Sequence, residues 1–404
     1  MALTLSNACL AKNYMYKFAS SWLGQGLITA EVPTWRQHRR LLCSAFNPSV
    51  LDGFVEVFNR QSERLTDALV REAGGAEFDH WPHFSENALQ TICQTAFGIP
   101  PNEESVADKQ YATAVGQMLG AVMTRASHVW MHFDRLYNLT RTKRVQDAAV
   151  KILKRTSLNV IEKRKATMKE KFTGDNNNSG TRRFKAFLDL LLELNNDGKI
   201  TEQDVREEVD TMIVAGHDTT SHTLLMMFIL LGAYPEVQER VYQELQEAFG
   251  DSQRYVTKED LTKLVYTEAV VKETCRLYPV IPMLAREADT DIHFENFTIP
   301  AGTGILLCLY GIGRNPCWGP DADAFRPERW LDPASLPASP AAFAAFSLGR
   351  RGCMGKAQAL MQMKTTVAHV IRKFKVTASD KNLNLKFDFM IKPTSGGQIK
   401  LELR

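Results

Sequence analysis

The decapeptide Phe346-Ser347-Leu348-Gly349-Arg350-Arg351-Gly352-Cys353-Met354-Gly355 decides the fold of this chain. Its glycines permit positive φ angles and let the backbone approach a flat ligand closely. A helical pattern follows at once, from Lys356 to Phe374, and backbone amides at the start of a helix favour a thiolate over a thiol. An isolated cysteine is more often a buried apolar residue. A cysteine in such a loop can nevertheless ligate iron.

A long helix is predicted upstream of this loop. The segment from Val205 to Tyr234 contains no proline and predicts one helix of about 30 residues, long enough to cross a whole domain. Its second half is apolar almost all round, so we expect it to be buried. Pro235 then begins a charged amphipathic helix that ends near Phe249, and a further helix with a basic face is expected around Val145–Leu153.

The middle of the long helix reads Ala215-Gly216-His217-Asp218-Thr219-Thr220. A glycine inside a helix costs about 1 kcal/mol relative to alanine, which suggests that the space at Gly216 is needed. A buried Asp218 beside threonine hydroxyls suits a local break in the helix that can hold water. The alternative is a helix kink with a satisfied polar cluster.

A charged pair and a downstream loop form another pattern. Glu273 and Arg276 stand three residues apart in KETCRLYP, a spacing that allows an ion pair on one helix face. Such a pair is commonplace by itself. The stretch Phe325-Arg326-Pro327-Glu328-Arg329-Trp330 follows about fifty residues later and offers further arginines.

These motifs, in this order, resemble those of the cytochrome P450 superfamily. The decapeptide is similar to the haem loop of that family, with phenylalanine, two glycines, arginine and cysteine at the family offsets. The resemblance implies that Cys353 is the axial ligand of the haem iron and that Phe346, Gly349 and Gly355 shape the loop around it. It also implies that Arg351 is a partner of a haem propionate.

The other motifs acquire roles through the same resemblance. Asp218 and Thr219 lie where the family relays protons during oxygen activation. Glu273, Arg276 and Arg329 resemble the three residues that lock the loop that holds the cysteine.

Three further residues complete the expected contacts with haem. Trp35 and Arg39 stand one helical turn apart in WRQHRRLL, as in the family helix that binds a propionate. Arg286 is another candidate, because guanidinium groups suit carboxylates. Each arginine could instead be a solvated surface residue. His217 is expected to be a packing or solvent residue rather than a ligand.

Within the superfamily the resemblance is to family 4, or the wider clan around it, of animal microsomal enzymes. Ala215 departs from it, because many family 4 members have a glutamate there that forms an ester with a haem methyl group. The chain also begins close to the Trp35 helix, so we expect it to lack the membrane anchor, the hinge and the first sheet strands of full-length relatives.

Composition and charge set the remaining limits. A hydrophobic share of 44% and a charged share of 24% suit a globular protein, and no composition shift divides the chain. We expect one domain over 1–404, mainly α with small β-sheets (α+β). A net charge of +3 gives no argument for nucleic acid. Seven cysteines without a CxxC pair argue against disulfides and zinc.

The C-terminal third is expected to hold the sheets. The range 292–309 contains β-type runs around the turn Pro300-Ala301-Gly302, and 387–403 predicts a hairpin around Ser395-Gly396-Gly397. By resemblance, 278–284 and 394–398 line the substrate pocket. Both stretches are apolar or small, so they indicate an apolar substrate; the alternative is ordinary core and hairpin packing.

The resemblance therefore implies a haem-thiolate monooxygenase that inserts one oxygen atom from O2 into an apolar substrate such as a fatty acid. Its cofactor would be haem b, held non-covalently apart from the bond between Cys353 and iron. NADPH-cytochrome P450 reductase is the expected electron donor, with cytochrome b5 and a membrane surface as further partners, on the cytosolic face of the endoplasmic reticulum. The alternatives are a haem-thiolate isomerase or dehydratase, or a truncated, non-catalytic haem-binding protein.

Overall fold

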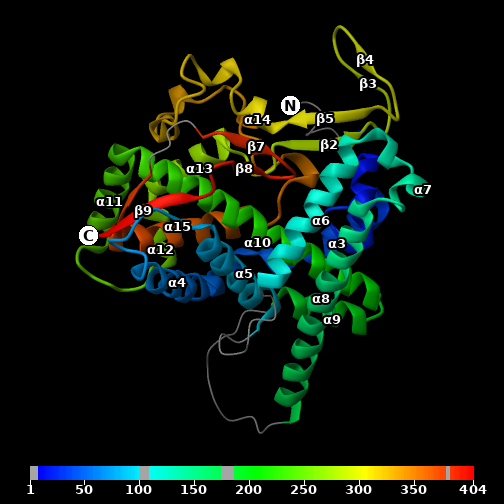
Figure 1. Cartoon of the computed structure of the whole chain (residues 1–404), viewed down its shortest axis with the longest axis horizontal. Coiled ribbons are helices and arrows are strands. Elements are labelled where there is room, and N and C mark those ends of the chain that lie inside the picture. Colours follow the sequence, from blue (N-terminus) through cyan, green and yellow to red (C-terminus); the bar gives the residue numbers. More distant parts are fainter. Residues whose placement is uncertain (1–7, 100–108, 174–185, 379–382) are drawn as a thin grey trace. The chain divides into compact units, whose positions relative to one another are not determined.

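The structure is a computed structural model that describes residues 8–99, 109–173, 186–378 and 383–404 (Figure 1). The chain divides into two compact units. Unit 1 contains Met1–Ala11, Val55–Ala88 and Asp218–Arg404, and unit 2 contains Lys12–Phe54 and Leu89–His217.

Three helices contribute residues to both units: α4 (Pro48–Val70), α5 (Trp81–Phe97) and α10 (Glu202–Ala233).

Unit 2 is built from helices. Besides parts of the three shared helices, its elements are η1 (Tyr14–Ala19), α2 (Ser20–Leu23), α3 (Val32–Leu42), η2 (Cys43–Phe46), α6 (Lys109–Ser127), η3 (Val129–His132), α7 (Asp134–Tyr137), α8 (Arg141–Thr173) and α9 (Phe187–Asn196). Arg164 on α8 connects two of its neighbours, because its guanidinium binds Asp189 of α9 at 2.7 Å and the carbonyl of Gly98 at 2.8 Å. This charged fork holds α8, α9 and the end of α5 together.

Unit 1 combines helices with small antiparallel sheets. Its helices and 3-10 turns are α11 (Pro235–Phe249), α12 (Lys258–Lys263), α13 (Val265–Leu277), α14 (Leu309–Ile312), η4 (Pro316–Trp318), η5 (Pro327–Trp330), η6 (Pro333–Ser335), η7 (Pro340–Ala342), η8 (Gly349–Arg351) and α15 (Lys356–Lys373). Its strands are β1 (Phe78–Asp79), β2 (Met283–Glu287), β3 (Ile292–His293), β4 (Thr298–Ile299), β5 (Gly304–Cys308), β6 (Phe374–Thr377), β7 (Leu385–Phe387), β8 (Ile391–Pro393) and β9 (Gln398–Leu403). Figure 1 shows β2 beside β5, with the β3–β4 hairpin extending from their end.

The core of unit 1 surrounds the apolar half of α10. Leu224, Leu225 and Met227–Leu231 pack with residues of α11, α13 and α15 in one buried cluster. Gly232 lets α10 pass close to the chain after β6, since a Cβ atom there would lie 2.7 Å from the amide nitrogen of Ala378. Gln238 of α11 binds β6, because its side-chain amide donates to the carbonyl of Val376 and accepts from the N–H of the same residue.

The predicted terminal hairpin is wrong in its pairing. β8 pairs with β7, whereas β9 pairs with β6 and, at its start, with β1. The cause lies in long-range contacts: the carbonyl of Gly397 accepts hydrogen bonds from the backbone and the ring of His80, and its N–H binds Asp79. Beyond this anchor, Ile399 and Leu401 point into the core as Phe374 and Val376 do, which fixes the register with β6.

The predicted local break at Asp218 is also wrong, because α10 is helical throughout Glu202–Ala233. Donor side chains further along the helix bind carbonyls of the preceding turn. His222 Nδ1 lies 2.7 Å from the Asp218 carbonyl oxygen, and Thr223 Oγ1 donates to Thr219 at 2.9 Å. These bonds supplement the helical pattern and leave it unbroken.

The other sequence-based expectations for elements agree with the structure. The long helix, the helix after Pro235, the helix after the glycine-rich loop and the short strands on either side of residue 300 are all present. The mainly helical fold with small β-sheets is therefore confirmed. Within the described residues, no single helix is long and apolar enough to cross a membrane; only Val32–Phe46 with Pro48–Val70, bent by 59°, would meet the length and composition as a pair.

Candidate functional site

The loop before α15 has its conformation set by backbone hydrogen bonds. The N–H of Cys353 donates to Phe346 O at 2.9 Å, and the N–H of Ser347 donates to Ala344 O at 2.7 Å. Ser347 and Gly349 have φ angles of 56° and 68°. Gly352 admits no side chain easily, because a Cβ would lie 3.0 Å from the carbonyl oxygen of Gly349. The loop therefore needs glycines at 349 and 352, and it carries Cys353 to the start of α15.

The other described cysteines are poorer candidates for metal ligation. Burial raises the pKa of both Cys93 and Cys275 to about 12, so these two side chains remain thiols at neutral pH. Burial also raises the pKa of Cys9. Cys43, Cys308 and Cys317 are exposed but lie outside any glycine-rich loop. Cys353 is exposed and lies in the glycine-rich loop, two residues before Gly355, the N-cap of α15.

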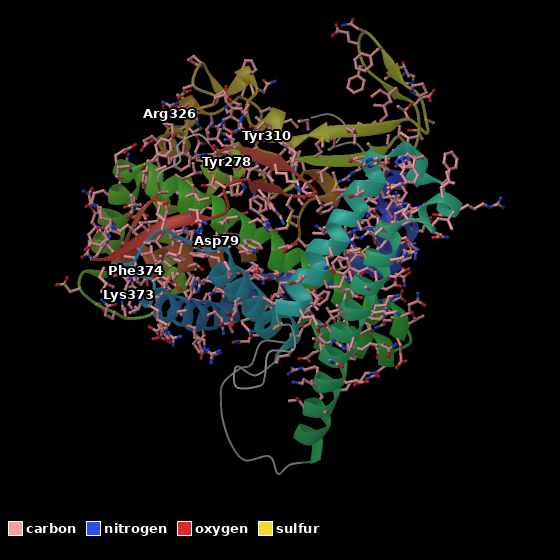
Figure 2. The ribbon with its side chains drawn as sticks, viewed as in Figure 1. Asp79, Tyr278, Tyr310, Arg326, Lys373 and Phe374 are labelled. Carbon is pink, nitrogen blue, oxygen red and sulfur yellow. The ribbon has the colours of Figure 1, made fainter. Side chains whose placement is uncertain are left out.

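The structure brings Glu273, Arg276 and Arg329 together in the interior of unit 1. All three are at most 1% exposed. The carboxylate of Glu273 accepts two bonds from Arg276 at 2.8 Å and one from Arg329 Nε at 2.9 Å. It also accepts bonds from Trp330 Nε1 and the Arg326 N–H, at 2.9 and 3.0 Å. In Figure 2 the label of Arg326, whose N–H binds Glu273, shows where this cluster lies. Sequence reasoning missed Trp330 as a hydrogen-bond donor to Glu273, although Trp330 directly follows Arg329.

The two arginines use their remaining donors on backbone carbonyls. Arg276 binds the carbonyls of Gly313, Ala322 and Ala324. Arg329 binds the carbonyls of Trp318 and Asp321. Buried charges persist only when paired and hydrogen-bonded in this way. The cluster thereby fixes the irregular segment between α14 and η5.

A chain of aromatic contacts runs from this cluster to the loop. Trp318 lies 5.5 Å from Trp330, Trp330 lies 4.8 Å from Phe343, and Phe343 lies 6.2 Å from Phe346, measured between ring centroids. Edge-on and tilted ring contacts of this kind favour defined orientations. Phe346 in turn accepts the backbone bond from Cys353, so the cluster has a packed connection to the candidate ligand.

The polar residues in the middle of α10 are mostly buried. Asp218 and Thr220 are buried, and Thr219 is half-buried. The space at Gly216 is explained within unit 2, because a Cβ there would lie 2.4 Å from Ile92 Cδ1 of α5. Packing of α10 against α5 is therefore one physical reason for a glycine at this position.

His222 is a residue that sequence reasoning missed. Its ring packs against Trp81 at 4.1 Å between centroids, and its Nδ1 must carry the proton because the Asp218 carbonyl can only accept. The spacing of four residues from Asp218 is the sequence signal that could have revealed this contact.

Trp35 and Arg39 lie one turn apart on α3 of unit 2, where Trp35 is buried and Arg39 half-buried. Between them, His38 Nδ1 meets Glu208 Oε1 at 2.8 Å, and this hydrogen bond raises the pKa of His38. The His38–Glu208 pair ties α3 to α10 and was not foreseen from the sequence.

Comparison with known proteins identifies the family. The family model described as Cytochrome P450 matches residues 7–401. The chain belongs to the cytochrome P450 family. It is 36% identical to Cytochrome P450 4V2 of Mus musculus, over 99% of this chain and 78% of that protein. It is 34% identical to Cytochrome P450 4V2 of Homo sapiens over the same shares, and 33% identical to Cytochrome P450 4c3 of Drosophila melanogaster over 97% of this chain and 76% of that protein.

The family 4 names of these relatives confirm the resemblance drawn from the sequence. As a cytochrome P450, the protein is a monooxygenase and an oxidoreductase that uses O2, a lipophilic substrate and a redox partner. Proteins of this family bind haem b through a cysteine thiolate that ligates the iron, and family 4 members are microsomal membrane enzymes.

The residues of unit 1 fit a haem group. Cys353 supplies a thiol on a loop whose backbone lies close to Gly352, where a Cβ would be 3.0 Å from the carbonyl oxygen of Gly349. Two guanidinium groups of the same unit suit propionate carboxylates. Arg286 on β2 is 4% exposed and donates from Nη1 to its neighbour's carbonyl at 3.0 Å. Arg351 is half-buried and donates from Nε to Leu10 O at 3.1 Å.

Proposed function

We propose that this cytochrome P450 inserts one oxygen atom from O2 into an apolar substrate, a fatty acid or another long lipophilic molecule, with electrons from NADPH delivered by a reductase. The observation that carries the proposal is the glycine-rich loop that brings Cys353 to the start of α15. The substrate class rests on analogy with family 4 relatives and on the apolar or small residues at 278–284 and 394–398.

In this proposal the chain's own residues hold the cofactor. Cys353 ligates the iron, while Phe346, Gly349 and Gly355 keep the loop in its bent conformation. Arg351, Arg286, Trp35 and Arg39 bind the propionates. When bound, haem activates O2, and electron donation from a cysteine thiolate favours cleavage of the O–O bond.

Two residues on α10 are proposed to move protons. The carboxyl group of Asp218 and the hydroxyl of Thr219 lie on consecutive residues, and the carbonyl of each accepts a bond from a side chain of the next turn. These bonds hold the backbone of both residues. Glu273, Arg276 and Arg329 act at a distance, because they fix the segment whose aromatic contacts reach Phe346.

A membrane surface is the proposed environment, on the cytosolic side of the endoplasmic reticulum. The location rests on resemblance to microsomal relatives. Unit 2 adds physical support, because the short segment formed by η3, α7 and the residues that follow exposes several large apolar side chains: Val129, Trp130, Phe133, Leu136 and Leu139. Clustered apolar side chains at the surface indicate a membrane or protein contact.

Two parts of the proposal concern organisation and partners. We propose that units 1 and 2 together form one cytochrome P450 domain over 1–404, because a single family model matches residues of both. NADPH-cytochrome P450 reductase is the proposed electron donor, with cytochrome b5 as a second partner.

The test of the iron ligand is spectroscopic. Cys353→Ala should abolish the red-shifted Soret band of the reduced protein with CO, because only a thiolate ligand produces that shift. Cys43→Ala and Cys308→Ala, which remove exposed thiols elsewhere, should leave the band in place. A band that survives Cys353→Ala would disprove the assignment. Reductase-dependent consumption of NADPH with substrate then separates a monooxygenase from an isomerase or dehydratase.

A further inference from the structure

The segment Ala8–Ala11 forms an added edge on the β2–β5 sheet. The N–H of Asp289 donates to Ala8 O at 2.8 Å, and the N–H of Glu287 donates to Ala11 O at 3.0 Å. Ala11 and Glu287 form an antiparallel bridge. The chain start and the end of β2 are therefore paired although they are far apart in sequence.

The carboxylate of Asp289 also binds this segment. Its Oδ2 accepts from the Leu10 N–H at 2.8 Å, and its Oδ1 accepts from the Ala11 N–H at 3.3 Å. One side chain thus holds two successive peptide groups, which sets the direction of the Leu10 peptide.

Apolar packing completes the attachment. Cys9 and Leu10 are each 3% exposed, and Cys9 packs with Ala288, Ile305 and Leu307. The segment therefore has both hydrogen bonds and buried side chains to hold it in place.

The peptide group that joins Leu10 to Ala11, called the Leu10 peptide below, also contacts the glycine-rich loop that carries Cys353. Its carbonyl oxygen accepts a bond from Arg351 Nε at 3.1 Å. A guanidinium group is planar, so a bond at Nε restricts the plane in which its two terminal nitrogens lie. The orientation of the Leu10 peptide therefore bears on the orientation of Arg351, two residues before Cys353.

We propose that Asp289 is a positioning residue for the cofactor: through the Leu10 peptide it orients Arg351 toward a haem propionate. The inference rests on the proposed function, which makes Arg351 a propionate partner. It assigns a role to a carboxylate that lies outside every motif and whose oxygens bind the N–H groups of Leu10 and Ala11.

The experiment is a double-mutant cycle read by the rate of haem loss. Haem transfer from the purified holoprotein to excess apoglobin gives this rate without any measurement of turnover. We expect Arg351→Ala to speed haem loss roughly tenfold or more, because a charge-assisted bond to a propionate is lost. Asp289→Ala should speed it about three- to tenfold, because the Leu10 peptide and Arg351 lose their fixed orientation.

The decisive comparison is the double variant. If Asp289 acts through Arg351, Asp289→Ala adds nothing in the Arg351→Ala background. Additive effects of the two changes would overturn the inference. An unchanged rate in Arg351→Ala alone would refute the proposed role of Arg351, which separates failure of the proposed function from failure of this inference.

Two further variants serve as controls, one for specificity and one for folding. Asp291 is a matched carboxylate of the same region, where it accepts a bond from the Ala301 N–H at 2.8 Å in a turn. Asp291→Ala should leave haem loss unchanged, and an equal acceleration would contradict a specific role for Asp289. If Asp289→Ala does not fold, Asp289→Asn replaces it, since the amide keeps one acceptor oxygen and should give an intermediate rate; a rate equal to wild type would again overturn the inference.

Discussion

The Glu273 cluster and the Cys353 loop show two different ways in which this chain fixes functional geometry. In the cluster, three fully buried charged side chains satisfy one another and at least five backbone carbonyls. In the loop, the backbone conformation sets the geometry. Ser347 is the one non-glycine residue with positive φ in the described parts of the chain. The cluster obeys ordinary rules for buried polar groups, whereas the loop departs from ordinary backbone preferences.

This contrast has a physical reason. A residue that supports the fold gains stability from every contact it makes, so contacts accumulate around it. A residue that must present an atom to a cofactor is positioned by its neighbours instead, and departures from local preference concentrate at such sites. Changes in the cluster should therefore have their largest effect on folding, while changes at the site should have their largest effect on chemistry.

The largest effect is expected from Glu273→Ala. The change leaves two buried guanidinium groups without their carboxylate, which should lower the free energy of unfolding by about 3–5 kcal/mol. Asp67→Ala is the control, because it removes an exposed carboxylate that lies 3.2 Å from Lys373 in the same unit. That surface pair should contribute no more than about 1 kcal/mol. Denaturant unfolding measures the free energy of unfolding of both variants. Equal losses of stability in the two would contradict the distinction between the buried cluster and a surface ion pair.

A smaller and different effect is expected from Thr219→Ala. The variant should fold and retain haem, but it should form less product per NADPH consumed, with the remaining electrons appearing in peroxide and water. Loss of a positioned proton donor commonly costs a factor of about one hundred in the step it serves, so a several-fold fall in the ratio is a modest expectation.

Thr220→Ala is the matched control, because Thr220 is the next residue on α10 and is buried. It should change the ratio of product to NADPH less than Thr219→Ala does. A ratio that stays constant in Thr219→Ala would remove Thr219 from the proton relay.

A still smaller effect is expected at Ser347, where the positive φ of the Cys353 loop predicts backbone strain. Ser347→Gly should raise the free energy of unfolding by about 0.5–1 kcal/mol, because glycine adopts φ near 56° without a Cβ clash. Ser347→Ala separates the causes: it removes the buried hydroxyl, which has no hydrogen-bond partner among the described residues, yet keeps the Cβ. If alanine stabilises as much as glycine, the hydroxyl rather than the backbone is the source.

The sequence predicted those features that depend on local pattern. The lengths of α10, α11 and α15 followed from apolar periodicity and from Pro235, and the Cys353 loop followed from its glycines. The grouping of Glu273 with Arg276 followed from helical spacing, whereas Arg329 was added only through family resemblance. Each of these signals lies within a short stretch of chain.

Features set by distant contacts escaped prediction. The partner of β9 depends on His80 and Asp79, which hold Gly397 from some three hundred residues away. The space at Gly216 depends on Ile92 of α5, so a packing requirement resembled a functional one. The contact of His222 with Asp218 is local, and only the four-residue spacing indicates it, because every residue inside a helix has a carbonyl four residues before it.

The smallest effect is expected at Ala215, the half-buried residue of α10 where many family 4 relatives have a glutamate that forms an ester with haem. A methyl group has no carboxylate for that bond, so haem here should be held only by the Cys353–iron bond, propionate contacts and apolar packing. Acid with organic solvent protonates the thiolate and unfolds the pocket, and it should therefore extract unmodified haem completely. Haem that remained on the polypeptide would contradict this and would point to another carboxylate. Ala215→Glu is the converse test, because it places a carboxylate one turn before Thr219, and its expected result is a fraction of haem that resists extraction after turnover. The same variant with Cys353 replaced by alanine should show no such fraction, since the linkage would form only when the thiolate-bound haem turns over.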